Sequence, residues 1–239
     1  MSDHHLSSPA RRNLLLAGAS SITLAGWSGR DALAAEPASG SAPNSIPPDE
    51  ALGRLMQGNA RYAANTPSNK DYSAGRVARV TAQYPIAAIV GCSDSRVAPE
   101  LAFDQGPGDL FVVRVAGNFV NDDSLASLEY GVEYLGVPLI MVLGHTNCGA
   151  VTATVKVIQE GVHLPGHLPE LVRAIKPAVH MAGLDHGADL VARATIENVR
   201  LNTNRLMISK PLIGRYVKSA KVKVVGGIYD LATGKIELI

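Results

Sequence analysis

Three short apolar runs, each rich in β-branched residues, limit what this chain can fold into. They cover residues 85–91, 109–115 and 138–143, and segments with helical spacing of apolar residues separate them. This alternation is typical of parallel strands, because each parallel connection must cross the sheet and usually does so as a helix. The sequence therefore predicts an α/β fold with a mainly parallel central sheet flanked by helices.

Helices and a closing hairpin are predicted around these runs. Ser124 is expected to cap a helix that ends at Gly136. Two further helices are expected over about 150–160 and 188–208, and the runs 221–229 and 235–238 predict a hairpin. Before the first strand, Asp49 is expected to cap an N-terminal amphipathic helix, whose apolar side is predicted to hold Leu52, Leu55, Met56 and Asn59.

The N-terminal residues 1–34 have the pattern of a signal peptide. Arg11 and Arg12 precede an apolar region that ends in Ala32-Leu33-Ala34, so we expect cleavage after Ala34. The adjacent arginines predict twin-arginine export to the periplasm. A disordered tail that happens to contain two arginines is the alternative. Residues 35–48 are rich in Pro, Ser, Ala and Gly and predict a flexible linker, which leaves 49–239 as one folded domain.

Composition argues against nucleic-acid binding and against a membrane-spanning segment. The chain has 239 residues, of which 46% are hydrophobic, and a formal net charge of +1. Nucleic-acid binding is not expected, because its affinity comes largely from basic side chains that neutralise phosphates. No apolar stretch approaches the roughly 20 residues that a membrane span requires, so no membrane span is expected.

The two cysteines of the chain each lie beside other metal-ligating side chains. Cys92 is followed by Asp94, and His145 precedes Cys148 by three residues. Both clusters follow predicted strands, at the sheet edge where ligands usually bind, and their thiols, imidazole and carboxylate are zinc ligands. A disulfide between the cysteines is the alternative in an oxidising compartment. Because Asp94 and His145 lie close to the cysteines in the sequence, a metal site is favoured over a disulfide.

Arg96 adds a second possible partner for the Asp94 carboxylate. In an extended segment alternate side chains share one face, so Cys92, Asp94 and Arg96 can point toward one site. Asp94 can then bind the metal, or lie beside it in a bidentate ion pair with Arg96. Both arrangements remain open at this point.

The segments Cys92–Val97 and His145–Ala150 resemble the two zinc motifs of the β-carbonic anhydrases. The resemblance extends from about Asp49 to residue 239 and includes 111–118 and 127–132. It implies a β-carbonic anhydrase-like catalytic domain with an N-terminal helical arm. The implied activity is the reversible hydration of carbon dioxide to bicarbonate and a proton.

The resemblance also implies roles for individual residues. One Zn²⁺ per subunit would be held by Cys92, His145 and Cys148, with water or Asp94 as the fourth ligand. Asp94 and Arg96 would be catalytic, and Gln83 would help to hold the substrate.

Assembly and two rival functions follow from the same resemblance. A homodimer or homotetramer is implied, with active sites near the subunit interface and the N-terminal helix packed on a neighbour; packing of that helix on its own domain is the alternative. Hydrolases of carbon disulfide and carbonyl sulfide resemble the same family. A non-catalytic zinc-binding protein, with Asp94 permanently closing the site, is the remaining possibility.

Overall fold

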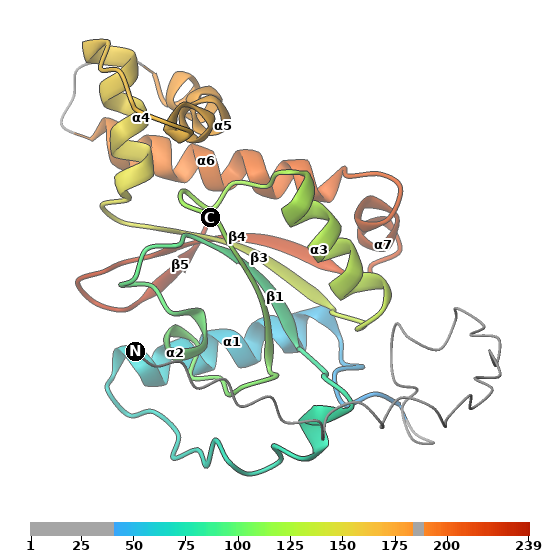
Figure 1. The fold of residues 1–239 in the computed structure, drawn as a ribbon. Coiled ribbons are helices and arrows are strands. Elements are labelled where there is room, and N and C mark those ends of the chain that lie inside the picture. Colours follow the sequence, from blue (N-terminus) through green and yellow to red (C-terminus); the bar gives the residue numbers. More distant parts are fainter. Residues whose placement is uncertain (1–40, 184–188) are drawn as a thin grey trace, which may run out of the picture. The chain divides into compact units, whose positions relative to one another are not determined.

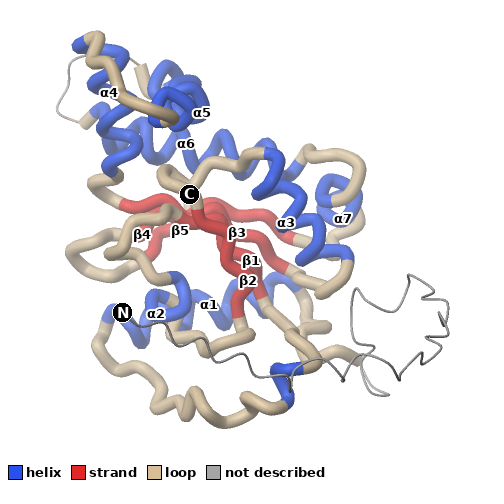
Figure 2. Tube along the Cα trace, viewed as in Figure 1, coloured by secondary structure: helices blue, strands red, loops and turns tan. Residues whose placement is uncertain are grey.

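The computed structural model describes residues 41–183 and 189–239. The predicted signal peptide and residues 35–40 of the predicted linker lie outside the described residues. The five described strands form one sheet with helices on both faces (Figures 1 and 2). This arrangement confirms the predicted α/β fold.

The central sheet is parallel except at one edge. In order across the sheet, its strands are β2 (Leu110–Arg114), β1 (Ala87–Gly91), β3 (Leu139–His145), β4 (Lys223–Tyr229) and β5 (Ile236–Leu238). Only β5 is antiparallel, and it forms the predicted hairpin with β4. Gly91 of β1 pairs with Leu143 of β3. This register brings the carboxyl ends of β1 and β3 to the same edge of the sheet.

Alternate residues of the two central strands fill two separate cores. Ala88 and Val90 face one cluster, which includes Leu128 and Val199 from the helices above the sheet. Ala87 and Ile89 face another, which includes Leu55. Both faces of these strands are buried, and this is why the strands read as continuous apolar runs in the sequence.

Helices cover both faces of the sheet (Figure 1). One face carries α1 (Pro48–Ala63) and α2 (Pro99–Ala102), and the other carries α3 (Asp122–Glu133), α6 (Leu190–Met207) and α7 (Ile213–Lys218). Two more helices, α4 (Gly149–Glu160) and α5 (Leu168–Met181), pack with α6 around the cysteines. A short 3₁₀ turn, η1 (Ala78–Val80), precedes β1.

Two predicted helix starts need correction. The helix α3 begins at Asp122, and its cap is Asn121, whose side chain accepts a hydrogen bond from the Ser124 backbone N–H. Ser124 is thus already inside the first turn, where its N–H is one of those a cap must satisfy. The helix α1 begins at Pro48 rather than after Asp49. Proline is favoured there because its φ suits a helix and the first turn needs no N–H donor.

Ordered structure begins before Asp49. Asn44, within the predicted linker, is buried, and its side-chain amide donates to the carbonyl oxygens of Pro85 and Leu135. The Pro/Ser/Ala-rich composition of this segment does not predict these contacts, because they depend on one asparagine side chain. Within the described ranges, no helix is both long enough and apolar enough to span a membrane.

The helix α1 packs on its own domain. Ala51 and Leu55 are buried against the sheet, and the buried Asn59 side chain donates to the carbonyl oxygens of Ala102 and Gly234. These contacts agree with the alternative named above, in which the N-terminal helix packs on its own domain.

Candidate metal centre

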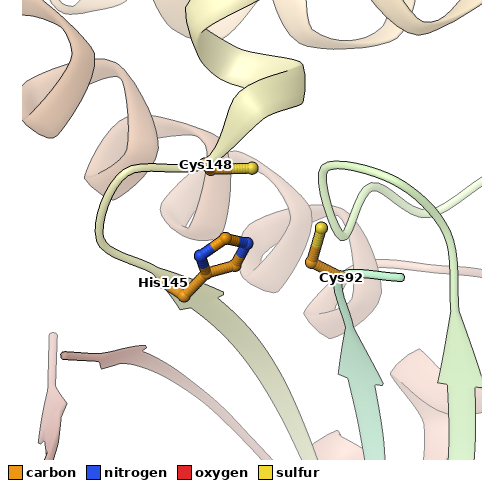
Figure 3. Close-up of side chains that lie close together, drawn as sticks. All are labelled: Cys92, His145 and Cys148. Atoms are coloured by element: carbon orange, nitrogen blue, oxygen red, sulfur yellow. The ribbon is translucent and has the colours of Figure 1, made fainter. Parts of the chain in front are cut away.

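Three side chains meet at the carboxyl edge of the sheet. Cys92 directly follows β1, His145 ends β3, and Cys148 precedes the first residue of α4. Their ligand atoms all lie within 4.8 Å of one another, and all three residues are buried. Figure 3 shows the side chains pointing toward a common space. Residues 53 positions apart meet here because β1 and β3 are adjacent and parallel.

Both cysteines carry free thiols. Cys92 and Cys148 are buried but form no disulfide in the described part of the chain, which contains both cysteines of the sequence. The metal-site prediction, rather than the disulfide alternative, agrees with this geometry.

The His145 ring is oriented by its own loop. Its Nδ1 lies 2.9 Å from the backbone oxygen of Thr146. A carbonyl can only accept, so Nδ1 carries the proton and Nε2 keeps a lone pair. Nε2 is buried and has no hydrogen-bond partner among the described residues. An orphaned nitrogen lone pair beside two sulfurs is the arrangement that a bound metal ion would satisfy.

The Cys92 sulfur accepts hydrogen bonds that favour its thiolate. The pKa of Cys92 is lowered to about 4, chiefly by the hydrogen bond from the Cys148 thiol, and the Gly117 backbone N–H, 3.2 Å from the sulfur, contributes to this shift. The pKa of the Cys148 thiol is raised, because its proton is held in the hydrogen bond to Cys92. A negative charge is thus already favoured within the cluster, as a divalent cation site requires.

Asp94 lies beside this cluster but is held by Arg96. The Arg96 Nε and Nη2 donate to the two carboxylate oxygens at 2.9 and 2.7 Å, and the Arg96 backbone N–H donates at 3.0 Å. These bonds, led by the guanidinium, hold the pKa of Asp94 well below its usual range. Asp94 Oδ2 remains 3.8 Å from His145 Nε2. The carboxylate is therefore ionised, adjacent to the cluster, and engaged with arginine.

Arg114 is a site residue that the sequence reasoning missed. It ends β2, and its guanidinium donates to the backbone oxygens of Cys92, Asp94 and Val97 at 2.7–2.9 Å. It therefore shapes the loop that carries Cys92 and Asp94. The sequence feature that could have indicated this role is the position of Arg114, a charged residue at the end of an otherwise apolar strand.

Gln83 is not brought to this cluster within one chain. It is exposed and lies between η1 and β1, before the amino end of the strand, whereas Cys92 follows its carboxyl end. The length of β1 separates the two positions.

A buried Cys-His-Cys cluster at the carboxyl edge of a parallel sheet defines a candidate metalloenzyme of the α/β class. The family model for carbonic anhydrase matches residues 87–236. A carbonic anhydrase from Mycolicibacterium smegmatis is 40% identical over 197 residues, which cover 82% of this chain and 95% of that protein. The chain belongs to the carbonic anhydrase family.

Solved structures narrow the family to its β class. A Coccomyxa β-carbonic anhydrase, in complex with acetazolamide, is 26% identical with a TM-score of 0.63, covering 79% of this chain and 86% of that one. Tetrameric β-carbonic anhydrases of the ascomycete Sordaria macrospora share the fold at 22% identity and a TM-score of 0.63, covering 80% and 97%. The enzyme is accordingly a β-class carbonic anhydrase, and its reaction is the hydration of carbon dioxide.

Proposed function

We propose that the enzyme acts with one Zn²⁺ per subunit, held by the Cys92 and Cys148 sulfurs and His145 Nε2. The observation that carries this proposal is the buried His145 Nε2, which has no hydrogen-bond partner in the described ranges, in a cluster whose ligand atoms lie within 4.8 Å of one another. Two sulfurs and one imidazole are a zinc donor set, and a catalytic zinc site keeps its fourth position open. When bound, zinc supplies a Lewis acid that lowers the pKa of a water molecule to about 7, a general value for carbonic anhydrases rather than one measured on this chain.

The Asp94–Arg96 pair supports an open fourth position. Because both carboxylate oxygens already accept hydrogen bonds from Arg96, Asp94 is kept as a neighbour of the site rather than as a ligand. This favours catalysis over the permanently closed zinc-binding protein.

Asp94 then serves as a hydrogen-bond acceptor. Its low pKa keeps the carboxylate ionised through the physiological range, so it can accept the proton of the attacking oxygen in a hydrogen bond and turn a lone pair toward carbon dioxide. Arg96 positions the carboxylate. Cys92, His145 and Cys148 are all buried, which limits the access of bulk water to their ligand atoms.

Zinc content and hydration rate, measured together on the purified chain, test the proposal. We expect about one zinc per subunit and stopped-flow carbon dioxide hydration well above buffer between pH 7 and 9. Carbon disulfide and carbonyl sulfide serve as parallel substrates. Cys148→Ser is the matched control and should lose both zinc and activity. If the zinc-loaded enzyme hydrolyses only a sulfur substrate, the assignment of carbon dioxide as substrate is wrong. If the enzyme is active without zinc, the assignment of zinc is wrong.

We also propose that the subunits form a homodimer or homotetramer. The segment before β1 exposes Val77 and Val80 by 86% and 80% of their surface, and water-exposed valines in pairs favour an interface. Gln83 lies on the same segment, so its proposed role in holding substrate requires the active site of a neighbouring subunit. Val80→Asp should reduce the sedimentation coefficient to that of a smaller species, and Gln83→Ala should raise KM without changing the assembly. Unchanged behaviour of both variants would contradict this proposal.

Export to the periplasm is proposed from the N-terminal sequence alone. Arg11 and Arg12 precede the apolar region that ends at Ala34. In a Gram-negative host we expect the shortened chain in the periplasmic fraction, and Arg11→Lys with Arg12→Lys should leave the full chain in the cytoplasm. Equal distribution of both forms would contradict twin-arginine export.

A further inference from the structure

A chain of hydrogen bonds links the helix α6 to the Cys92 sulfur. The loop that follows β2 passes beside Cys92 (Figure 3), and its Gly117 backbone N–H lies 3.2 Å from Cys92 Sγ. The carbonyl oxygen of Gly117 accepts a 2.8 Å hydrogen bond from the side-chain amide of Asn198. Gly117 thus faces the metal centre with its N–H while Asn198 holds its carbonyl.

The backbone conformation and the surroundings of Gly117 exclude a larger side chain at this position. Its φ is +85°, a conformation that favours glycine, and an added Cβ would lie 2.6 Å from Ile175 Cδ1. No larger side chain could anchor the loop here by packing. The position of the Gly117 N–H therefore depends on contacts of the Gly117 backbone, and among the described residues the bond from Asn198 spans the greatest sequence separation.

Asn198 is itself held rigidly. It is fully buried, and its carbonyl and side-chain oxygens accept hydrogen bonds from the Asn202 amide at 2.8 and 3.3 Å. The Asn202 side-chain oxygen in turn accepts the Val120 N–H at 2.8 Å. Two asparagines one helical turn apart thus hold both ends of the loop that runs from Gly117 to Val120.

The approach of α6 to the sheet sets this geometry. A Cβ at Gly144 would lie 2.6 Å from Val199 Cγ2, and one at Gly226 would lie 2.8 Å from Val199 Cγ1. Two glycines on neighbouring strands therefore let Val199 seat α6 directly on the sheet. Because Asn198 is the residue next to Val199, this close packing of α6 also brings Asn198 to the Gly117 loop.

We propose that Asn198 is a positioning residue for the metal centre, which acts through Gly117 to fix the Cys92 sulfur. The proposal rests on the zinc site proposed above. An N–H donated to a metal-bound sulfur restricts the ligand's orientation, and the loss of such outer contacts typically weakens metal binding by about 10- to 100-fold. Asn198 contacts Gly117 rather than Cys92 itself, so its effect on the sulfur is indirect.

Asn198→Leu tests this role, because leucine has similar volume but no donor. We expect zinc transfer to a chelator to become about tenfold faster, and the sulfur-to-metal charge-transfer bands of the cobalt-substituted enzyme to shift. Asn198→Ala serves as a second variant, smaller and able to admit water, and should change both readouts in the same direction. The Gly117 amide should also exchange with solvent faster in either variant.

Two variants on the same helix serve as controls. Thr203→Val changes a buried hydroxyl that has no hydrogen-bond partner among the described residues. Leu206→Ala weakens the core cluster that also holds Val120, but it removes neither the Asn198–Gly117 nor the Asn202–Asn198 hydrogen bond. Both should keep the wild-type cobalt spectrum and zinc release rate. If Leu206→Ala shifts the spectrum as Asn198→Leu does, or if neither Asn198 variant shifts it, the positioning role is overturned while the zinc enzyme stands. If the wild-type chain takes up no zinc, the proposed metal itself fails.

Discussion

Arg96 grips both oxygens of the Asp94 carboxylate, at 2.9 and 2.7 Å, while Asp94 Oδ2 stays 3.8 Å from His145 Nε2. A carboxylate this close to a candidate metal centre can act as a ligand or as a neighbour, and its two bonds to the guanidinium favour the second arrangement. The bidentate geometry matters, because a lysine would offer a point charge and not a planar fork.

Removing this arginine should lower catalysis without removing the metal. In Arg96→Ala, the freed Asp94 carboxylate can turn to the fourth ligand position, so kcat/KM for hydration should fall by about 100-fold while zinc content stays near one per subunit. Arg96→Lys should recover only part of the activity. Stopped-flow hydration and metal analysis on the same samples provide the check, and full activity in Arg96→Ala would contradict the switch.

Arg114 should matter for the shape of the Cys92 loop. Its guanidinium donates to three backbone oxygens, including those of Cys92 and Asp94, and Arg114→Met leaves these acceptors without that donor. We expect zinc affinity and kcat/KM each to fall by about tenfold or more. Arg54→Met, which removes an exposed ion pair with Glu50, is the control and should change neither. Chelator competition and stopped-flow rates distinguish the two variants.

Two glycines of α1 should respond oppositely to the same substitution. A Cβ at Gly58 would lie 1.8 Å from the Phe103 carbonyl oxygen, whereas none of the described atoms lies within 4 Å of one at Gly53. Gly58→Ala should lower the free energy of unfolding by about 2 kcal/mol or more, because the helix must move away from its contact. Gly53→Ala should raise it by about 0.5–1 kcal/mol, through better helix propensity. Denaturant unfolding measures both, and equal effects would show that α1 does not pack as described.

Asp104 should contribute stability that depends on pH. Burial opposes its charge, but hydrogen bonds from Ser68 and the 2.6 Å contact with Arg61 outweigh that effect and lower the pKa of Asp104 to about 2. A carboxyl whose folded pKa lies below its unfolded value of about 4 stabilises the fold above pH 4. That contribution is lost as the pH falls toward 2.

The variant Asp104→Asn isolates this contribution. At pH 7 it should lower the free energy of unfolding by about 2 kcal/mol, since the donors around this buried position lose a charged acceptor. The difference from wild type should shrink at pH 3. Glu50→Gln, in an exposed pair, should change stability by less than about 0.5 kcal/mol at either pH. A constant difference across this range would contradict the ionised state of Asp104.

Local patterns predicted most of the secondary structure. The predicted runs 85–91, 109–115 and 138–143 contain β1, β2 and most of β3, since strands buried on both faces leave continuous apolar sequence. Helix starts were less predictable: Ser124 and Asn121 are both good caps, and only the hydrogen bond from Ser124 N–H to the Asn121 side chain distinguishes them.

The sequence by itself determined the candidate ligand types and their attachment to strand ends, because Cys92, His145 and Cys148 lie in short segments whose chemistry is local. Only the tertiary structure decided that β1 and β3 are neighbours, that Arg114 braces the Cys92 loop, and that Asn198 reaches Gly117. These contacts join residues 22 and 81 positions apart. They depend on the strand order and on how closely α6 packs against the sheet at Gly144, and long-range packing of this kind leaves no periodic signal in the chain.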